Sequence, residues 1–208
     1  MSWGERHTDI RALLDTLAGG VRRIAEGRLV ALWLTGSLTY GDFDRGSSDI
    51  DYLAILSETL SPDQRSALAG LHEDIAGQWP EWGERIEGSW IPEAWLSRVD
   101  PPMEGRPYIN GGAFWIPDPP YGNEWLINLY ALREAGVALI GPDPAVTIPA
   151  IDIADVRRAS ARDLHDEWVP KLAGDEIFAS SHHQAYVTLT ICRILHRAER
   201  DEVASKRA

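Results

Sequence analysis

The chain has 208 residues, 44% of them hydrophobic, which suits one globular unit or two small domains that share an interface. Its 32 acidic and 20 basic residues give a formal net charge of -12, and no Lys- or Arg-rich patch is visible, which argues against nucleic acid as a partner. No stretch approaches the roughly 20 apolar residues that span a bilayer. Because the first residues also lack a signal layout, we expect a cytoplasmic protein with no membrane partner.

Helix and strand patterns alternate in the first half of the chain. Apolar residues recur at helical spacing over 8–27, and the short apolar runs at 29–34 and 50–56 are typical of buried strands. A helical pattern follows over 62–78, and alternation within 84–91 predicts a third strand. The first half is therefore expected to form a mixed sheet with flanking helices.

The second half is predicted to be helical. Residues 92–122 are rich in Pro, Gly and aromatics, as in a crossing between domains, and 138–151 reads as a proline-rich linker. Helical patterns occupy 123–137, 152–168 and 181–200. Cys192, the single cysteine, is expected to be a buried thiol. We predict an α+β chain with one domain at 1–118 and a helical domain at 119–208, whose C-terminal completeness is left open.

The stretch LTGSLTYGDFDRGSSDIDYLAIL, residues 34–56, carries the strongest chemical signal. A phosphate-binding P-loop has Lys and then Ser or Thr after its second glycine, but Asp42 follows Gly41 here. A calcium loop starting at Asp42 would need Glu at its twelfth position, which is Leu53. Both interpretations are excluded.

Magnesium-dependent phosphoryl or nucleotidyl transfer fits the same stretch. Residues i and i+2 of a strand share a face, so Asp49 and Asp51 are expected to project together and to bind Mg²⁺ through hard oxygen ligands. The Gly36-Ser37 turn would let backbone N–H groups and a hydroxyl approach nucleotide phosphates. Ser48 could help to bind the phosphates or metal, or could simply be a turn residue.

This pattern resembles the nucleotidyltransferase superfamily of DNA polymerase beta, in which an apolar strand, Gly-Ser and a spacer precede Asp-apolar-Asp. In this chain the matching residues are Gly36-Ser37 and Asp49-Ile50-Asp51. The resemblance implies a third carboxylate on a later strand, which would act as the general base. Glu87 is the candidate for this role, and Glu84 is the runner-up.

The second half is similar to the C-terminal helical domain of bacterial aminoglycoside nucleotidyltransferases, the streptomycin and spectinomycin adenylyltransferase group. The stretches that carry this likeness are NEWLINLYALREAGVALIGPDP and AYVTLTICRILHRAERDEVASKR. The resemblance implies that Arg193 and Lys206 face the nucleotide phosphates. It also implies that Trp115 lines the acceptor pocket, although packing is an alternative role for this residue. His183 stands where drug-binding members carry an acidic residue.

The resemblance implies a monomeric, Mg²⁺-dependent enzyme that transfers AMP from ATP to a hydroxyl of a small acceptor. The expected acceptor is an aminoglycoside or spectinomycin-like antibiotic, and the acidic balance of the chain suits a cationic molecule. Two alternatives stay open. One is a toxin-like nucleotidyltransferase that acts on tRNA or a protein, and the other is a module that binds a nucleotide without transfer.

Overall fold

The computed structural model describes residues 8–172, 174 and 180–200. The elements, in chain order, are α2 (Thr8–Ala25), η1 (Glu26–Arg28), β1 (Leu29–Thr35), α3 (Ser37–Tyr40), β2 (Ile50–Leu56), α4 (Pro62–Gln78), η2 (Pro80–Trp82), β3 (Ile86–Pro92), η3 (Glu93–Ser97), β4 (Tyr108–Asn110), β5 (Ala113–Phe114), α5 (Glu124–Ala135), β6 (Val137–Ile140), α6 (Pro144–Thr147), α7 (Ile153–Asp163), the π-helix η4 (Leu164–Trp168), α8 (Val169–Leu172) and α9 (Ser181–Arg200). None of the helices described here is both long and apolar enough for a membrane crossing.

The six strands form one mixed sheet in the order β5-β4-β3-β2-β1-β6. Only β2 and β3 run parallel, and every other neighbouring pair of these strands is antiparallel. A parallel pair cannot be joined by a tight hairpin, and here α4 forms the crossover from β2 to β3. The predicted mixed sheet with flanking helices is confirmed.

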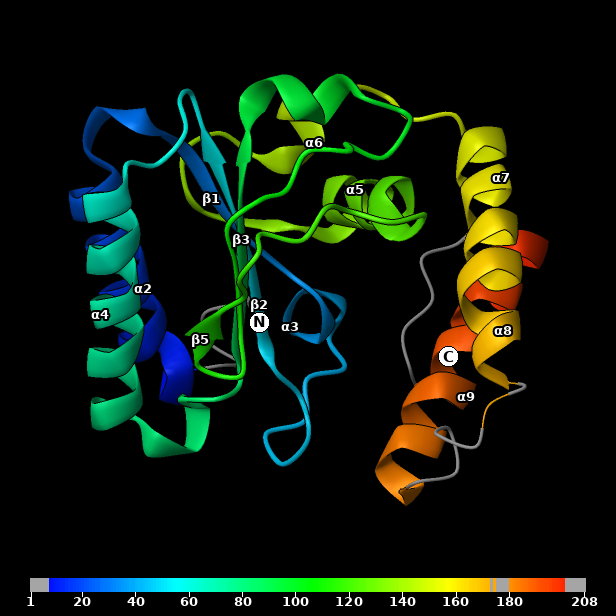
Figure 1. Ribbon diagram of the computed structural model, residues 1–208, viewed down its shortest axis with the longest axis horizontal. Helices are drawn as coiled ribbons and strands as arrows, with labels where there is room; N and C mark the ends of the chain where they lie inside the picture. Colours follow the sequence, from blue (N-terminus) through cyan, green and yellow to red (C-terminus); the bar gives the residue numbers. More distant parts are fainter. Residues whose placement is uncertain (1–7, 173, 175–179, 201–208) are drawn as a thin grey trace.

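Helices α2 and α4 cover one face of the sheet (Figure 1). Ile50 and Tyr52 of β2 point into this layer and are buried, as the two-residue period of a strand requires. A capping box starts α4, in which Ser61 Oγ accepts from the Gln64 amide at 3.2 Å and Gln64 Oε1 accepts from the Ser61 amide at 3.0 Å. With Ile50 and Tyr52 fixed on this side, Asp51 lies on the opposite face.

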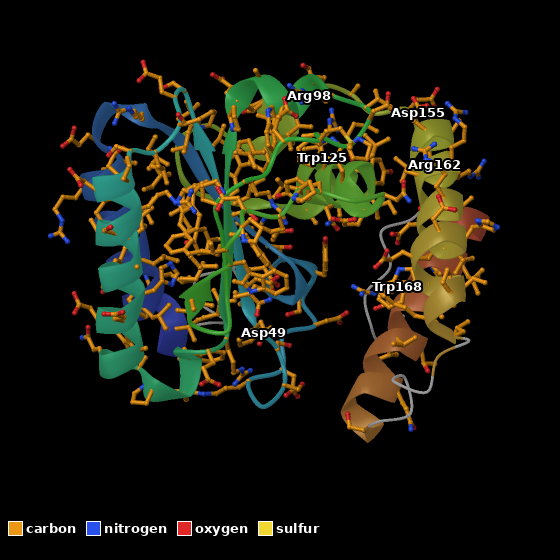
Figure 2. All side chains as sticks on the ribbon, in the orientation of Figure 1. Asp49, Arg98, Trp125, Asp155, Arg162 and Trp168 are labelled. Carbon is orange, nitrogen blue, oxygen red and sulfur yellow. The ribbon has the colours of Figure 1, made fainter. Side chains whose placement is uncertain are left out.

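The opposite face is covered only in part, by α5. Trp33 and Leu53 pack there with Trp125 of α5 in a second apolar core. Figure 2 shows Trp125 close to one end of the sheet, whereas Asp49 lies toward the other end. The apolar core therefore does not extend over Asp51, and the face becomes polar at the end where β2 begins.

The last helices stand beyond α5. Helix α7 packs against α5, and α9 packs against α7 and η4. Helices η4 and α9 meet in a small apolar cluster of Trp168, Val187 and Ile194. In the view of Figure 1, α3 lies between the sheet and α9. The C-terminal helices therefore face the same side of the sheet as α3 and α5.

Two expectations from the sequence are corrected. The segment expected as a proline-rich linker begins as strand β6, whose Val137 and Ala138 pair with Leu34 and Trp33 of β1. Cys192 is exposed on α9 instead of buried. The division of the chain near residue 118 stays a prediction, and so does a separate helical domain, because α5 and β6 pack with the sheet.

Candidate active site

Asp51 and Glu87 are brought together by the parallel pair of strands. They are direct register partners, Asp51 on β2 and Glu87 on β3. Neighbouring strands lie about 4.8 Å apart, which is the scale of the separation between the two backbones. Because Ile50 and Ile86 point into the α2 and α4 layer, both carboxylates lie on the opposite face, where they are half-buried. Glu87, the third carboxylate that the sequence predicts, is therefore adjacent to the Asp-Ile-Asp motif.

Gly36 lies against the Asp51 carboxylate. Its φ of 71° is in the region that favours glycine, and a Cβ at this position would overlap Asp51 Oδ2. The Thr39 hydroxyl donates to the Gly36 carbonyl at 2.9 Å, and the Thr39 amide donates to it at 3.0 Å. The turn from β1 into α3 therefore needs glycine both for its backbone conformation and for the space that Asp51 occupies.

Asp49 lies one residue before β2 and pairs with Arg85. Arg85 Nε is 3.6 Å from Asp49 Oδ1, and 52% of the Asp49 side chain is exposed. Arg85 also donates to the carbonyls of Ser48 and Arg45, and its guanidinium lies 4.5 Å from the centre of the Trp82 ring. An ion pair this exposed contributes about 1 kcal/mol or less. The Asp49 carboxylate can therefore exchange Arg85 for another cation at little cost.

The two serines of the motif differ in their surroundings. Ser37 is the half-buried first residue of α3, directly after Gly36. Ser48 closes a turn, since its hydroxyl accepts from the Asp44 amide at 3.0 Å and its own amide donates to the Asp44 carbonyl at 2.8 Å. The geometry thus gives Ser48 the turn role that the sequence left open, and its role toward a nucleotide stays a prediction.

Glu87 accepts a hydrogen bond from Tyr108 on the next strand. The Tyr108 hydroxyl donates to Glu87 Oε1 and accepts from Asn110 Nδ2 at 2.9 Å. Burial and the bond to the Glu87 carboxylate both raise the pKa of Tyr108, so its hydroxyl keeps its proton in neutral solution. Glu84, the runner-up, is exposed and lies in the turn before β3. Of the two glutamates, only Glu87 lies in register with Asp51.

Trp115 lies beside Tyr108. The two rings meet edge to face with their centres 5.2 Å apart, and the Trp115 amide donates to the Tyr108 carbonyl at 2.9 Å. Trp115 is 51% exposed, whereas the other tryptophans that the structure describes are buried or half-buried. An aromatic surface is therefore open to solvent close to Glu87.

The nucleotide and acceptor contacts expected in the last helix are described only in part. Arg193 of α9 is half-buried, with Nη2 donating to Thr190 Oγ1 at 3.1 Å. Its Nε is buried and has no hydrogen-bond partner among the described residues. Lys206 and the side chain of His183 lie outside the described part of the chain. Their expected roles, and that of Arg193, stay predictions.

The donor chemistry of this site suits Mg²⁺. Asp49, Asp51 and Glu87 offer carboxylate oxygens, the hard ligands that Mg²⁺ prefers. Within the described ranges, however, no three side chains of the kind that bind metals are gathered as a metal site. Asp49 is paired with Arg85 instead. The residues therefore fit the ion in the kind of their donor atoms, and their roles as ligands stay a prediction.

Sequence reasoning missed Arg85, Tyr108 and Asn110. Tyr108 and Asn110 are two residues apart in the short strand β4, within a segment that was expected to be loop. The alternation Tyr-Ile-Asn before Gly111-Gly112 is the signal that could have indicated a hairpin strand with two polar residues on one face. Arg85 carried no such signal, because its contacts join it to a loop distant in sequence.

Comparison with known proteins bears on the fold. No family model matches the sequence, and no curated protein matches it. Among solved structures, the chain is similar to spectinomycin adenyltransferase AAD(9) from Enterococcus faecialis, crystallised with ATP and spectinomycin. The TM-score is 0.71 at 20% sequence identity, over 94% of this chain and 78% of that one. The chain therefore has the fold of an adenyltransferase, which confirms, at the level of the fold, the resemblance indicated by the Gly-Ser and Asp-Ile-Asp motifs.

Proposed function

We propose that this protein transfers AMP from ATP to a hydroxyl of a small antibiotic of the aminoglycoside or spectinomycin type. The observation that carries the proposal is the register pairing of Asp51 with Glu87 on an open, polar part of the sheet, beside Gly36. The similar solved protein is a spectinomycin adenyltransferase that was crystallised with ATP, which supports both the reaction and the donor nucleotide.

In the proposed reaction, an acceptor hydroxyl attacks the α-phosphorus of ATP. A new P–O bond forms, the bond between the α-phosphorus and the bridging oxygen breaks, and pyrophosphate leaves. Glu87 takes the proton of the hydroxyl, for which it needs only hydrogen-bond reach. Asp49 and Asp51 would hold Mg²⁺, which neutralises charge on the triphosphate. Ser37, Ser48, Arg193 and Lys206 would orient the phosphates or the metal.

The acceptor is proposed to be cationic. Glu124, at the start of α5, accepts from the Gly122 amide at 2.9 Å, and it lies close enough to Asp163 to help raise the pKa of that group. Glu124 would add a second carboxylate to Glu87 on the side of the sheet where the acceptor would bind. Trp115 would provide an aromatic wall, and His183 is the proposed contact that replaces an acidic residue.

The test uses the whole chain with ATP labelled at the α-phosphate, Mg²⁺, and a panel containing spectinomycin, streptomycin and other aminoglycosides. We expect labelled antibiotic and pyrophosphate in equal amounts. Asp51→Asn and Glu87→Gln should each lower the rate by about a thousandfold, or about 4 kcal/mol of transition-state stabilisation. Glu93→Gln, an exposed glutamate just after β3, is the matched control and should retain the wild-type rate.

Two results would contradict the proposal. Normal turnover by Asp51→Asn would show that the site is elsewhere. Binding of ATP without transfer to any acceptor would favour the module that only binds a nucleotide. The adjacency of Glu87 to Asp51 opposes that alternative, since a binding module has no need of a base beside the metal ligand. Labelling of tRNA or protein instead of antibiotic would favour the toxin-like enzyme.

A further inference from the structure

Tyr108 touches the proposed base from the side away from Asp51. In the antiparallel pair β3–β4, Ser89 lies opposite Tyr108 and Gly88 lies opposite Ile109. Tyr108 is therefore a diagonal neighbour of Glu87 on the same face of the sheet. Its hydroxyl donates to Glu87 Oε1. Glu87 thus lies between a hydroxyl donor on β4 and a carboxylate on β2.

The orientation of the Tyr108 hydroxyl is set by its own surroundings. Asn110 Nδ2 donates to the hydroxyl oxygen at 2.9 Å, so the hydroxyl hydrogen is directed to Glu87. The ring contacts Trp115 edge to face at 5.2 Å, and the Arg106 guanidinium lies 5.0 Å from its centre. Tyr108 is therefore held both at its ring and at its hydroxyl.

This arrangement limits the conformations of Glu87. A free glutamate side chain loses rotamer entropy when it is fixed, whereas a carboxylate that is already held on one oxygen is pre-organised. Oε2, the oxygen that Tyr108 does not bind, is then the one assigned to the acceptor hydroxyl. Among the described residues, Tyr108 is the hydrogen-bond donor of the Glu87 carboxylate.

We propose that Tyr108 is a positioning residue, which with Asn110 aims the Glu87 carboxylate at the acceptor hydroxyl. The proposal rests on the proposed function of Glu87 as the base. Tyr108 would touch the base and neither the nucleotide nor the acceptor, so its effect should be on turnover and not on binding. Asn110 would act one step further away, by fixing the hydroxyl of Tyr108.

Tyr108→Phe tests the hydroxyl while keeping the ring and its contacts with Trp115 and Arg106. We expect kcat to fall about 10- to 100-fold, with KM for ATP and for the acceptor changed less than about twofold. The matched control is Tyr121→Phe, another tyrosine with its ring against Arg106 but with its hydroxyl near Ser89 instead of Glu87. Its kcat should stay within about twofold of the wild type.

A double variant separates positioning from a general structural role. Glu87→Asp keeps a carboxylate base but shortens the side chain, so that the carboxylate no longer reaches the Tyr108 hydroxyl. In that background, Tyr108→Phe should cost less than about twofold in kcat, because the contact is already lost. If the two losses multiply, or if Tyr108→Phe alone retains more than half of the wild-type kcat, the positioning role is overturned.

A measurement without turnover tests the contact itself. In protein labelled with ¹³C at tyrosine Cζ, the resonance absent from Tyr108→Phe identifies Tyr108. This resonance should move in Glu87→Gln and stay in place in Glu124→Gln. A Tyr108 signal that ignores Glu87→Gln overturns the inference even if the enzyme is active. Conversely, a wild type that modifies no acceptor refutes the proposed function, whatever the Tyr108 signal does.

Discussion

The ring of Tyr52 occupies the space that a side chain at position 88 would need: a Cβ on Gly88 would overlap its Cζ and Cε1 atoms. The two residues are register partners on β2 and β3, and each directly follows one of the paired carboxylates, Asp51 and Glu87. The close approach of ring and backbone on one face therefore supports the pairing of carboxylates on the other face.

Gly88→Ala should lower the free energy of unfolding by about 2 to 4 kcal/mol, because the buried Tyr52 ring cannot yield without moving the strands. Urea unfolding measures the loss. Gly70→Ala is the matched control, since a Cβ there meets open space on α4, and alanine should stabilise the helix by about 0.5 to 1 kcal/mol. Equal stabilities of the two variants would show that Tyr52 can move aside.

Gly36→Ala should greatly reduce the rate of antibiotic labelling and only slightly lower the free energy of unfolding. The new Cβ would displace the Asp51 carboxylate, and the φ of 71° adds strain of about 1 kcal/mol. We expect antibiotic labelling to fall by about a hundredfold or more, as for a displaced metal ligand. Gly19→Ala, with open space around the added Cβ, should keep full activity. Wild-type turnover by Gly36→Ala would mean that Asp51 is not a ligand.

His72 should make the fold sensitive to mild acid. Burial lowers the pKa of His72 to about 4, and its Nε2 lies 2.9 Å from the Tyr52 hydroxyl. His72 therefore binds a proton more tightly in the unfolded chain than in the folded one. As the pH falls from about 6.5 toward 4, the free energy of unfolding should decrease by about 2 to 3 kcal/mol. His72→Gln should flatten this slope in urea unfolding at several pH values. Parallel slopes for variant and wild type would contradict the assignment.

Asp163 should have the opposite dependence. Burial raises its pKa to about 6, with a further upward effect from Glu124 and Glu167, although Trp168 Nε1 donates to Oδ2 at 3.0 Å. A folded pKa above the unfolded value favours folding at low pH, and this contribution is lost as the pH rises through 6. Asp163→Asn should therefore stabilise the protein at pH 8 by about 1 to 3 kcal/mol, a gain that vanishes below about pH 4.

The control for this prediction is Glu167→Gln in the π-helix η4, which directly follows Asp163. Its side chain is 55% exposed and pairs with Lys171, so the variant should change the free energy of unfolding by about 0.5 kcal/mol or less. The comparison is made by urea unfolding at pH 8 and pH 4. If Asp163→Asn has a lower free energy of unfolding than the wild type at pH 8, the ionised Asp163 carboxylate stabilises the fold and the prediction is wrong.

Local patterns were sufficient for the central strands and the long helices. The runs at 29–34 and 50–56 became β1 and β2, the alternation at 84–91 became β3, and helices α4 and α9 have the predicted bounds. These segments bury an apolar face whose period is visible in the sequence. Short strands are different: β6 has four residues, and its partner β1 is far away in the chain. The local pattern of apolar residues cannot predict a pairing between strands so far apart in the sequence.

The candidate site shows the same limit. The spacing of Asp49 and Asp51 indicated carboxylates at a strand end, but the side-by-side placement of Asp51 and Glu87 depends on the register of a parallel pair. Strand alternation also suggested that Asp49 and Asp51 project together, whereas Asp49 precedes β2 and pairs with Arg85. Side chains just outside a strand follow loop contacts instead of the strand period, so sequence alone could not orient Asp49.

Strand β6 also shields the edge of β1 from other chains. A bare edge offers free N–H and C=O groups to any passing strand and promotes aggregation. Here β6 occupies that edge, and Trp33 Nε1 donates to the Pro142 carbonyl at 2.8 Å just beyond it. A fragment that ends near 118 would expose this edge together with the apolar surface under α5. Solubility of the N-terminal half should therefore depend on residues up to about 142 remaining attached to it.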